Sequence, residues 1–249
     1  RTPQHGPLLP DLCNMYAAFD GQGVDVNRAA AWNMTNTNSV TADGSFLLFD
    51  GTNYLVDPRG GHEDTTWTAG LKGMVVRFVL ASTASNQTIV AAGAGSYTAG
   101  EWGLIVNTVN GLRFQIDDSG GINRGNNLVA IGSLQTDVEY RLYVWEDGSG
   151  DLQQYLEVDG GADVSASLEG FTWTTTPNTA FSIGAEQDGT ELAADGTKIA
   201  VYLFTAAAGD TAANRTQFAT GTDRLRSWHP SEDEGADYLL FAYDGSAMA

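Results

Sequence analysis

Cysteine and histidine are scarce in this chain of 249 residues. Cys13 is the single cysteine, which excludes an intramolecular disulfide and with it the class of small secreted domains that disulfides hold together. Among the three histidines, His62 is the one candidate for acid–base chemistry, because His5 lies in a Pro-rich segment and His229 precedes Pro230. No apolar run approaches the ~20 residues that a membrane-spanning helix needs, so we expect no membrane insertion.

Basic residues are few relative to acidic ones. Lys and Arg number 12 against 31 Asp and Glu, which gives a formal net charge of −19. Such a charge repels phosphate backbones and anionic lipid surfaces, so we expect no nucleic-acid partner. Aspartate outnumbers glutamate and arginine outnumbers lysine, a bias that indicates a halophilic protein, since molar salt screens self-repulsion within ~3 Å. The alternative is a surface protein from an ordinary marine or secreted setting.

The clearest local pattern is a β-hairpin over residues 138–161. Alternating side chains run from Tyr140 to Trp145 and again from Tyr155 to Val158, and each segment is followed by a glycine-rich turn signal. Asp-Gly and Gly-Gly supply the positive φ angles that tight turns require. This alternation predicts two paired antiparallel strands.

Similar segments recur along the chain and predict a sandwich of two antiparallel sheets. The further strands are expected at Met15–Phe19, Ser45–Phe49, Asn53–Val56, Met74–Leu80, Gln87–Ala91, Trp102–Val106, Leu112–Ile116, Thr179–Ile183, Lys198–Phe204 and Tyr238–Tyr243. One helix is expected from Asp210, its N-cap, to Thr220. Residues 1–14 read as an extended Pro-rich arm and residues 15–249 as one domain, of a length that a single sandwich reaches.

Five short segments carry a family resemblance by their order in the chain. They are Tyr16–Gly21, Leu48–Leu55, Tyr140–Trp145, Leu156–Gly160 and Phe181–Gly184. In this order they resemble the laminin-G-like branch of the concanavalin A-like lectin and glucanase superfamily. The resemblance implies an all-β, concanavalin A-like jelly-roll sandwich of two antiparallel sheets, with one short helix near the C-terminal end. The chain departs from the family by lacking a tryptophan just before Tyr140.

Catalytic motifs of this superfamily are incomplete in the sequence. Its glycosidases carry Glu-x-Asp-x-x-Glu on one strand, because alternate positions point two carboxylates into the same cleft. Glu157 and Asp159 match the first two positions, but the third is Ala162. Lyases of similar fold need a histidine paired with a tyrosine, for which only His62 is available. Nucleophile motifs, phosphate-binding glycine loops and zinc spacings are absent from the sequence, so we predict a non-enzymatic protein.

Two loops are candidates for calcium, which superfamily lectins often hold with Asp and Asn oxygens at a sheet rim. One carries Asp117 and Asp118, followed by Ser-Gly-Gly, and the other carries Asp188. An acidic chain contains such loops in any case, so ordinary surface turns remain the alternative reading of both. The sequence offers no other cofactor.

Sugar binding requires an exposed aromatic ring beside hydrogen-bonding side chains, because pyranose C–H faces stack on rings while hydroxyls seek polar groups. Tyr97 and Trp102, in one loop, could form such a platform, and Trp173 is a second candidate. For each of the three, the alternative is a core aromatic that closes the end of the sandwich.

These observations predict a non-enzymatic, lectin-like surface protein, above all a viral or phage virion component with a role in assembly or host-glycan attachment. A secreted carbohydrate-binding lectin or adhesin is the alternative, and a glycan hydrolase or lyase is the third. Expected partners are further copies of the chain or other structural proteins of an assembly, and a cell-surface glycan. The chain begins at Arg1 rather than Met, so we expect a processed product at the extracellular or virion surface.

Overall fold

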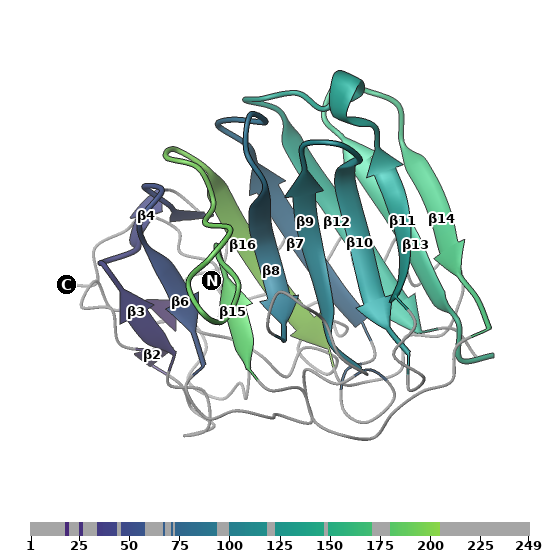
Figure 1. Ribbon diagram of the computed structural model, residues 1–249, viewed down its shortest axis with the longest axis horizontal. Helices are drawn as coiled ribbons and strands as arrows, with labels where there is room; N and C mark the ends of the chain where they lie inside the picture. Colours follow the sequence, from purple (N-terminus) through teal and green to yellow (C-terminus); the bar gives the residue numbers. More distant parts are fainter. Residues whose placement is uncertain are drawn as a thin grey trace, which may run out of the picture.

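The computed structural model describes eleven segments of the chain. These are residues 18–19, 25–26, 34–43, 46–57, 67, 71, 73–93, 100–118, 123–146, 149–170 and 180–204. Within them the chain is built of β-strands and one 3₁₀ turn, η2 (Ile131–Ser133), and two seven-stranded antiparallel sheets face each other (Figure 1). The predicted all-β sandwich of two antiparallel sheets is therefore confirmed.

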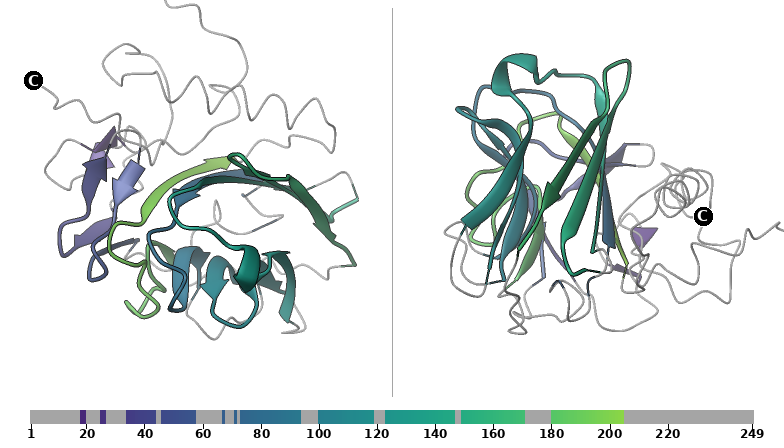
Figure 2. Two further views of the ribbon diagram at one scale, coloured as in Figure 1. Left: turned by 90° about the horizontal axis from the view of Figure 1, so that it is seen from above. Right: turned by 90° about the vertical axis from the view of Figure 1, so that its right-hand side faces the viewer.

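The first sheet, sheet I, contains β12, the longest of the described strands. Its order is β14 (Val164–Leu168), β13 (Leu152–Val158), β12 (Glu139–Glu146), β7 (Gly73–Val79), β16 (Lys198–Phe204), β5 (Phe46–Leu48), β4 (Thr41–Asp43). Seen from above, sheet I arches over the second sheet (Figure 2). Its strand order is not the order of the chain, as in a jelly roll, where successive segments alternate between the sheets.

The second sheet, sheet II, lies beneath it. Its order is β11 (Asn123–Val129), β10 (Gly111–Asp117), β9 (Trp102–Asn107), β8 (Gln87–Ala92), β15 (Phe181–Ile183), β6 (Tyr54–Val56), β3 (Thr35–Thr37). A separate pair, β1 (Ala18–Phe19) and β2 (Asp25–Val26), completes the described strands. The edges of the two sheets meet where the amide of Asn126 in β11 donates to the carbonyl oxygen of Ser167 in β14, at 2.8 Å.

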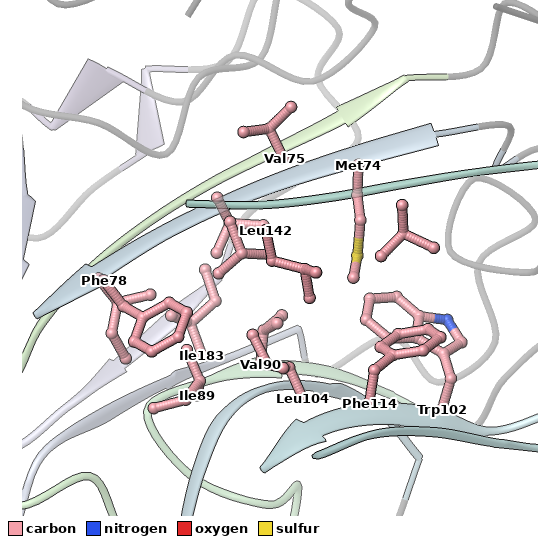
Figure 3. Close-up of a cluster of buried hydrophobic side chains, with 14 of the residues drawn as sticks. Met74, Val75, Phe78, Ile89, Val90, Trp102, Leu104, Phe114, Leu142 and Ile183 are labelled. Carbon is pink, nitrogen blue, oxygen red and sulfur yellow. The ribbon is translucent and has the colours of Figure 1, made fainter. Parts of the chain in front are cut away.

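The core lies between the sheets, because strand residues alternate between the two faces. Met74, Phe78 and Leu142 of sheet I point toward Leu104 and Phe114 of sheet II, whereas Val75, next to Met74 in the chain, points away from this core (Figure 3). Burying each such side chain contributes about 1.5–3 kcal/mol to folding. The outward direction of Val75 identifies an outer face of sheet I, which is important for the site described below.

Glycines stand where the hairpins need them. Gly111, which opens β10 after Asn110, has φ +89°, and a Cβ there would collide with the carbonyl oxygen of Val129. Gly160, in the turn between β13 and β14, has φ +70°. Both positions confirm turns that Asn-Gly and Asp-Gly predict in the sequence.

Five short or polar strands are absent from the sequence-based prediction, namely β2, β3, β4, β11 and β14. Three of them are sheet edges with three to five residues, and β11 is an edge strand that begins Asn-Arg-Gly-Asn-Asn, without apolar alternation. The predicted arm 1–14, the helix 210–220 and the strand 238–243 lie outside the described residues, so they and the single-domain division stay predictions. In the described part of the chain, no helix is long and apolar enough to cross a membrane.

Candidate functional site

Trp102 is a core residue, and the expectation that it presents an exposed ring is wrong. Its side chain is 0% exposed at the start of β9, and its ring packs against Trp67, Phe114 and Phe181 with centroid separations of 6.2, 6.2 and 6.3 Å. Burying the large indole in this aromatic cluster is favourable, and this is why the side chain of Trp102 points into the core. Tyr97 and Trp173, the other predicted platform residues, lie outside the described residues, as does His62.

Asp117 and Asp118 lie at the end of β10 and are both nine-tenths buried. The backbone N–H of Asp117 donates to the carbonyl oxygen of Glu101 at 2.9 Å, so a third buried carboxylate lies in the neighbouring strand segment. Asp118 accepts from Nε of Arg124 at 3.1 Å, whereas Oδ1 of Asp117 has no hydrogen-bond partner within the described segments. Burial, with the nearby negative charges of Glu101 and Asp118, raises the pKa of Asp117 above its ordinary value.

Positive charge reaches this end of sheet II through Arg113. Its Nη2 donates to Oδ1 of Asn123 at 2.7 Å, and Asn123 in turn hydrogen-bonds Asp117. The guanidinium lies over the backbone of Gly125, where a Cβ would come within 2.5 Å of Nε. Glycine at this strand position therefore makes room for the arginine.

Asp188 belongs to a different end of sheet II. Its Oδ1 accepts from the N–H and hydroxyl of Thr190, at 3.0 and 2.6 Å, and these hydrogen bonds lower its pKa. The loop is hydrogen-bonded to the start of β8, because the N–H of Thr88 donates to the carbonyl oxygen of Glu191. Asp188 thus stabilises its own turn.

No group of three or more His, Cys, Asp or Glu side chains that could hold a metal occurs in the part of the chain that the structure describes. Calcium binding at Asp117 and Asp118, or at Asp188, stays a prediction.

A second polar cluster lies on the outer face of sheet I, around Tyr155. We define the Tyr155 patch as Gln153, Tyr155 and Glu157 of β13 with Asp163 and Ser165 beside them. The three β13 residues alternate on one face while Leu152, Gln154 and Leu156 point inward, and Ser165 lies directly opposite Tyr155 in β14.

The ring of Tyr155 is partly exposed and lies beside other aromatic and acidic groups. Its hydroxyl donates to Oδ2 of Asp163 at 2.5 Å. Tyr143 is its direct partner across the β12–β13 pair, with ring centroids 6.3 Å apart and planes tilted by 42°. The patch therefore combines an accessible phenol ring with carboxylate, amide and hydroxyl side chains.

Glu157 is held in one orientation by two donors. The hydroxyl of Tyr143 donates to its Oε2 at 3.0 Å, and Nη1 of Arg141 reaches the same oxygen at 3.2 Å. Burial raises the pKa of Tyr143, so its hydroxyl stays protonated and able to donate. The Glu157 side chain itself keeps 34% of its surface exposed. It is a fixed carboxylate that solvent can still reach.

An ion-pair ladder continues from Arg141 toward the middle of sheet I. Arg141 lies directly opposite Arg77 in β7, and both guanidinium groups contact Oε1 of Glu139, at 3.5 and 2.8 Å. Arg77 is 2% exposed, and its Cζ lies 4.4 Å from the ring centroid of Phe46. The shared carboxylate offsets the repulsion between two arginines that face each other across the strand pair.

The sequence predicts β12 and β13 but does not locate the polar cluster on their outer face. It suggests Glu157 only as half of a glycosidase pair, and the structure places the second half, Asp159, in the exposed turn after β13. The signal that could have located the Tyr155 patch is the hairpin register, which sets Tyr143 against Tyr155 and Arg141 against Glu157.

No protein-family model and no curated protein matches this sequence. Solved structures share its fold. The receptor-binding domain of botulinum neurotoxin mosaic serotype C/D matches with TM-score 0.54 and 10% identity, over 87% of this chain and 52% of that chain. The binding domain of botulinum neurotoxin serotype D matches with TM-score 0.53 and 9% identity, over 88% and 52%. The chain thus spans about half the length of these toxin domains.

A third similar structure is domain 4 of an extracellular arabinanase from Geobacillus stearothermophilus, solved in complex with arabinotriose. It matches with TM-score 0.50 and 12% identity, over 79% of this chain and 94% of that domain. At such identities the likeness establishes the fold alone, a β-sandwich.

Proposed function

We propose that this protein is a non-enzymatic, lectin-like β-sandwich that binds carbohydrate through the Tyr155 patch. The observation that carries the proposal is the partly exposed ring of Tyr155 bordered by Glu157, Asp163, Gln153 and Ser165. A tyrosine ring offers a flat apolar surface to the C–H face of a sugar, and the surrounding side chains offer partners to its hydroxyls.

The fold supports this proposal by analogy. β-Sandwiches of this architecture include a domain described in complex with arabinotriose, and another described as a toxin's receptor-binding domain. The Tyr155 patch lies at the β13–β14 edge of the outer face of sheet I, where Tyr155 and Glu157 are partly exposed and Asp163 and Ser165 are exposed. Nearer the middle of the same face, Val75, Arg77 and Tyr143 are buried, so the accessible surface is confined to this edge.

The test is binding of the full chain to a glycan array, followed by calorimetric titration with arabino-oligosaccharides and with any array hit. We expect saturable binding that falls at least about tenfold in Tyr155→Ala, because loss of a ring contact worth ~1.4 kcal/mol corresponds to that factor. Tyr54→Ala is the matched control, since Tyr54 is a partly exposed tyrosine on sheet II. Equal binding by both variants, or none by the parent chain, would overturn the proposal.

We infer that this binding serves a surface assembly, such as a virion component with an assembly or host-glycan attachment role, built on a laminin-G-like module. The Pro-rich residues 1–14 and the net charge of −19 support display on an exterior surface rather than contact with nucleic acid. Light scattering of the chain with and without residues 1–11 tests it. A defined oligomer that deletion abolishes supports the assembly, whereas a strict monomer favours a secreted lectin or adhesin.

A further inference from the structure

We propose that Glu157 selects the ligand of the Tyr155 patch, and that the ligand is a neutral sugar whose hydroxyl groups donate to the free carboxylate oxygen of Glu157. The inference rests on the proposed carbohydrate-binding function and specifies the chemistry of the same site. The two oxygens of the Glu157 carboxylate differ in their hydrogen bonds. Both hydrogen bonds to Glu157 end on Oε2, so Oε1 has no partner among the described residues.

The direction of Oε1 is fixed before any ligand arrives. Turning the carboxylate would break the contacts of Oε2 with Tyr143 and Arg141. Arg141 is in turn restrained by Glu139, which the buried guanidinium of Arg77 holds at 2.8 Å. The acceptor is therefore already oriented when a ligand binds, and little conformational entropy of this side chain is lost. Such preorganisation favours selective recognition.

The charges of this ladder favour a neutral ligand. Arg77 and Arg141 balance Glu139 and Glu157, so the ladder itself carries no net formal charge. The exposed carboxylate of Asp163 adds one negative charge to the patch, which disfavours an anionic ligand. Carboxylate oxygens accept hydrogen bonds and cannot donate, and a sugar hydroxyl is a neutral donor that suits them. A uronic acid or sulfated sugar would instead bring acceptor oxygens and negative charge toward a protein of net charge −19.

A second acceptor borders the tyrosine ring on its other side. Oδ2 of Asp163 already accepts the Tyr155 hydroxyl, and its carboxylate is exposed. Glu157 lies two residues beyond Tyr155 on the same strand, about 7 Å along the chain at ~3.4 Å per residue. Carboxylates thus flank the ring from two directions, an arrangement that suits hydroxyl groups on one sugar ring lying over the phenol.

The first experiment compares neutral and acidic probes on the full, unaltered chain by calorimetric titration. The neutral probes are arabino-, gluco- and galacto-oligosaccharides, and the acidic probe is an oligogalacturonate of matched length. We expect the best neutral probe to bind at least about tenfold more tightly than the acidic one. Tighter binding of the acidic probe would overturn the inference while leaving carbohydrate binding intact, and absence of binding to every probe would overturn the proposed function itself.

The second experiment uses Glu157→Gln, which keeps the side-chain shape but replaces one acceptor oxygen with a donor. We expect at least a tenfold loss of affinity for the neutral probe. Glu169→Gln is the control, because Glu169 is an exposed glutamate just after β14. Its Oε1 accepts a hydrogen bond from the hydroxyl of Ser167 at 3.0 Å. Equal affinity of Glu157→Gln and the unaltered chain, with binding still lost in Tyr155→Ala, would contradict the inference alone.

Tyr143 is a positioning residue in this scheme, and Tyr143→Phe removes its hydroxyl without removing the ring. We expect a several-fold loss of affinity for the neutral probe, because the carboxylate of Glu157 loses one of the two donors that orient it. Since Tyr143 acts through that carboxylate, Tyr143→Phe should cause little further loss when Glu157→Gln is already present. An equal loss with and without Glu157→Gln would overturn the positioning role.

Discussion

The hydroxyl of Tyr143 donates to Oε2 of Glu157 at 3.0 Å, diagonally across the β12–β13 pair. This hydrogen bond links a fully buried tyrosine to a carboxylate that is one-third exposed. Hydrogen bonds to charged groups in such partly dry surroundings are worth more than neutral ones. The pair therefore connects the stability of sheet I with the chemistry of its outer face.

We expect Tyr143→Phe to lower the free energy of unfolding by about 1–2 kcal/mol, because the carboxylate of Glu157 loses one of its two donors. Tyr155→Phe is the matched variant and should cost less than about 1 kcal/mol, since its hydroxyl bonds Asp163 at an exposed position. Urea unfolding at neutral pH measures both. Equal losses would mean that burial of the bond contributes nothing.

Gln154 is a polar residue inside the sandwich, 2% exposed. Neither its amide oxygen nor its amide nitrogen has a hydrogen-bond partner among the residues that the structure describes. We expect Gln154→Leu to raise the free energy of unfolding by about 1 kcal/mol, because it removes two desolvated polar atoms and retains apolar volume. Gln153→Leu, on the outer face of the same strand, should give no comparable gain. Loss of stability in Gln154→Leu would indicate that the amide has partners in solution, such as a buried water.

The raised pKa of Asp117 makes stability depend on pH. Because its folded-state pKa lies above the ordinary 3.8, the folded protein retains this proton where the unfolded chain has lost it. The contribution of Asp117 to stability therefore falls as pH rises from about 4 through the folded-state pKa. We expect Asp117→Asn to have a free energy of unfolding ~1 kcal/mol above that of the parent chain near pH 7. Its melting temperature should be correspondingly higher.

The same comparison at acid pH serves as the control. Well below pH 3.8, where Asp117 is protonated in both states, the difference between Asp117→Asn and the parent chain should shrink toward zero. A difference that is constant over pH 3.5–7 would show that the substitution acts through packing rather than through the charge.

Salt should stabilise the protein. With 31 acidic and 12 basic residues, self-repulsion opposes the compact state, and molar NaCl screens it within ~3 Å. We expect the melting temperature to rise steadily from low to molar NaCl. A flat or falling melting temperature would remove the argument for a halophilic protein.

Much of the fold could be predicted because side-chain alternation and turn chemistry agree over the longer strands. β12 and β13 follow the predicted hairpin, and β7, β9, β10 and β16 coincide closely with the predicted segments. β11 was not predicted, because asparagines stand where alternating apolar residues would mark a strand. Its position in the sheet is determined by its pairing with β10. Tertiary pairing, absent from local sequence, decides such edge strands.

The site was harder to predict because it depends on which face each residue occupies. Trp102, Leu104 and Val106 alternate on one face of β9, so strand parity already indicated that Trp102 is buried, but its proximity to a glycine-rich loop suggested exposure. The Tyr155 patch requires the register of β12, β13 and β14 together. That register brings Tyr143 to Tyr155 and Ser165 to its other side.

The most direct test of carbohydrate binding at the Tyr155 patch is an NMR titration of the full chain with the tightest-binding neutral oligosaccharide. We expect saturable shifts of the Tyr155 ring and of the amides of Gln153, Glu157 and Ser165, with no comparable change around Asp117. Shifts confined to the Asp117 end of sheet II, or spread without saturation, would contradict it.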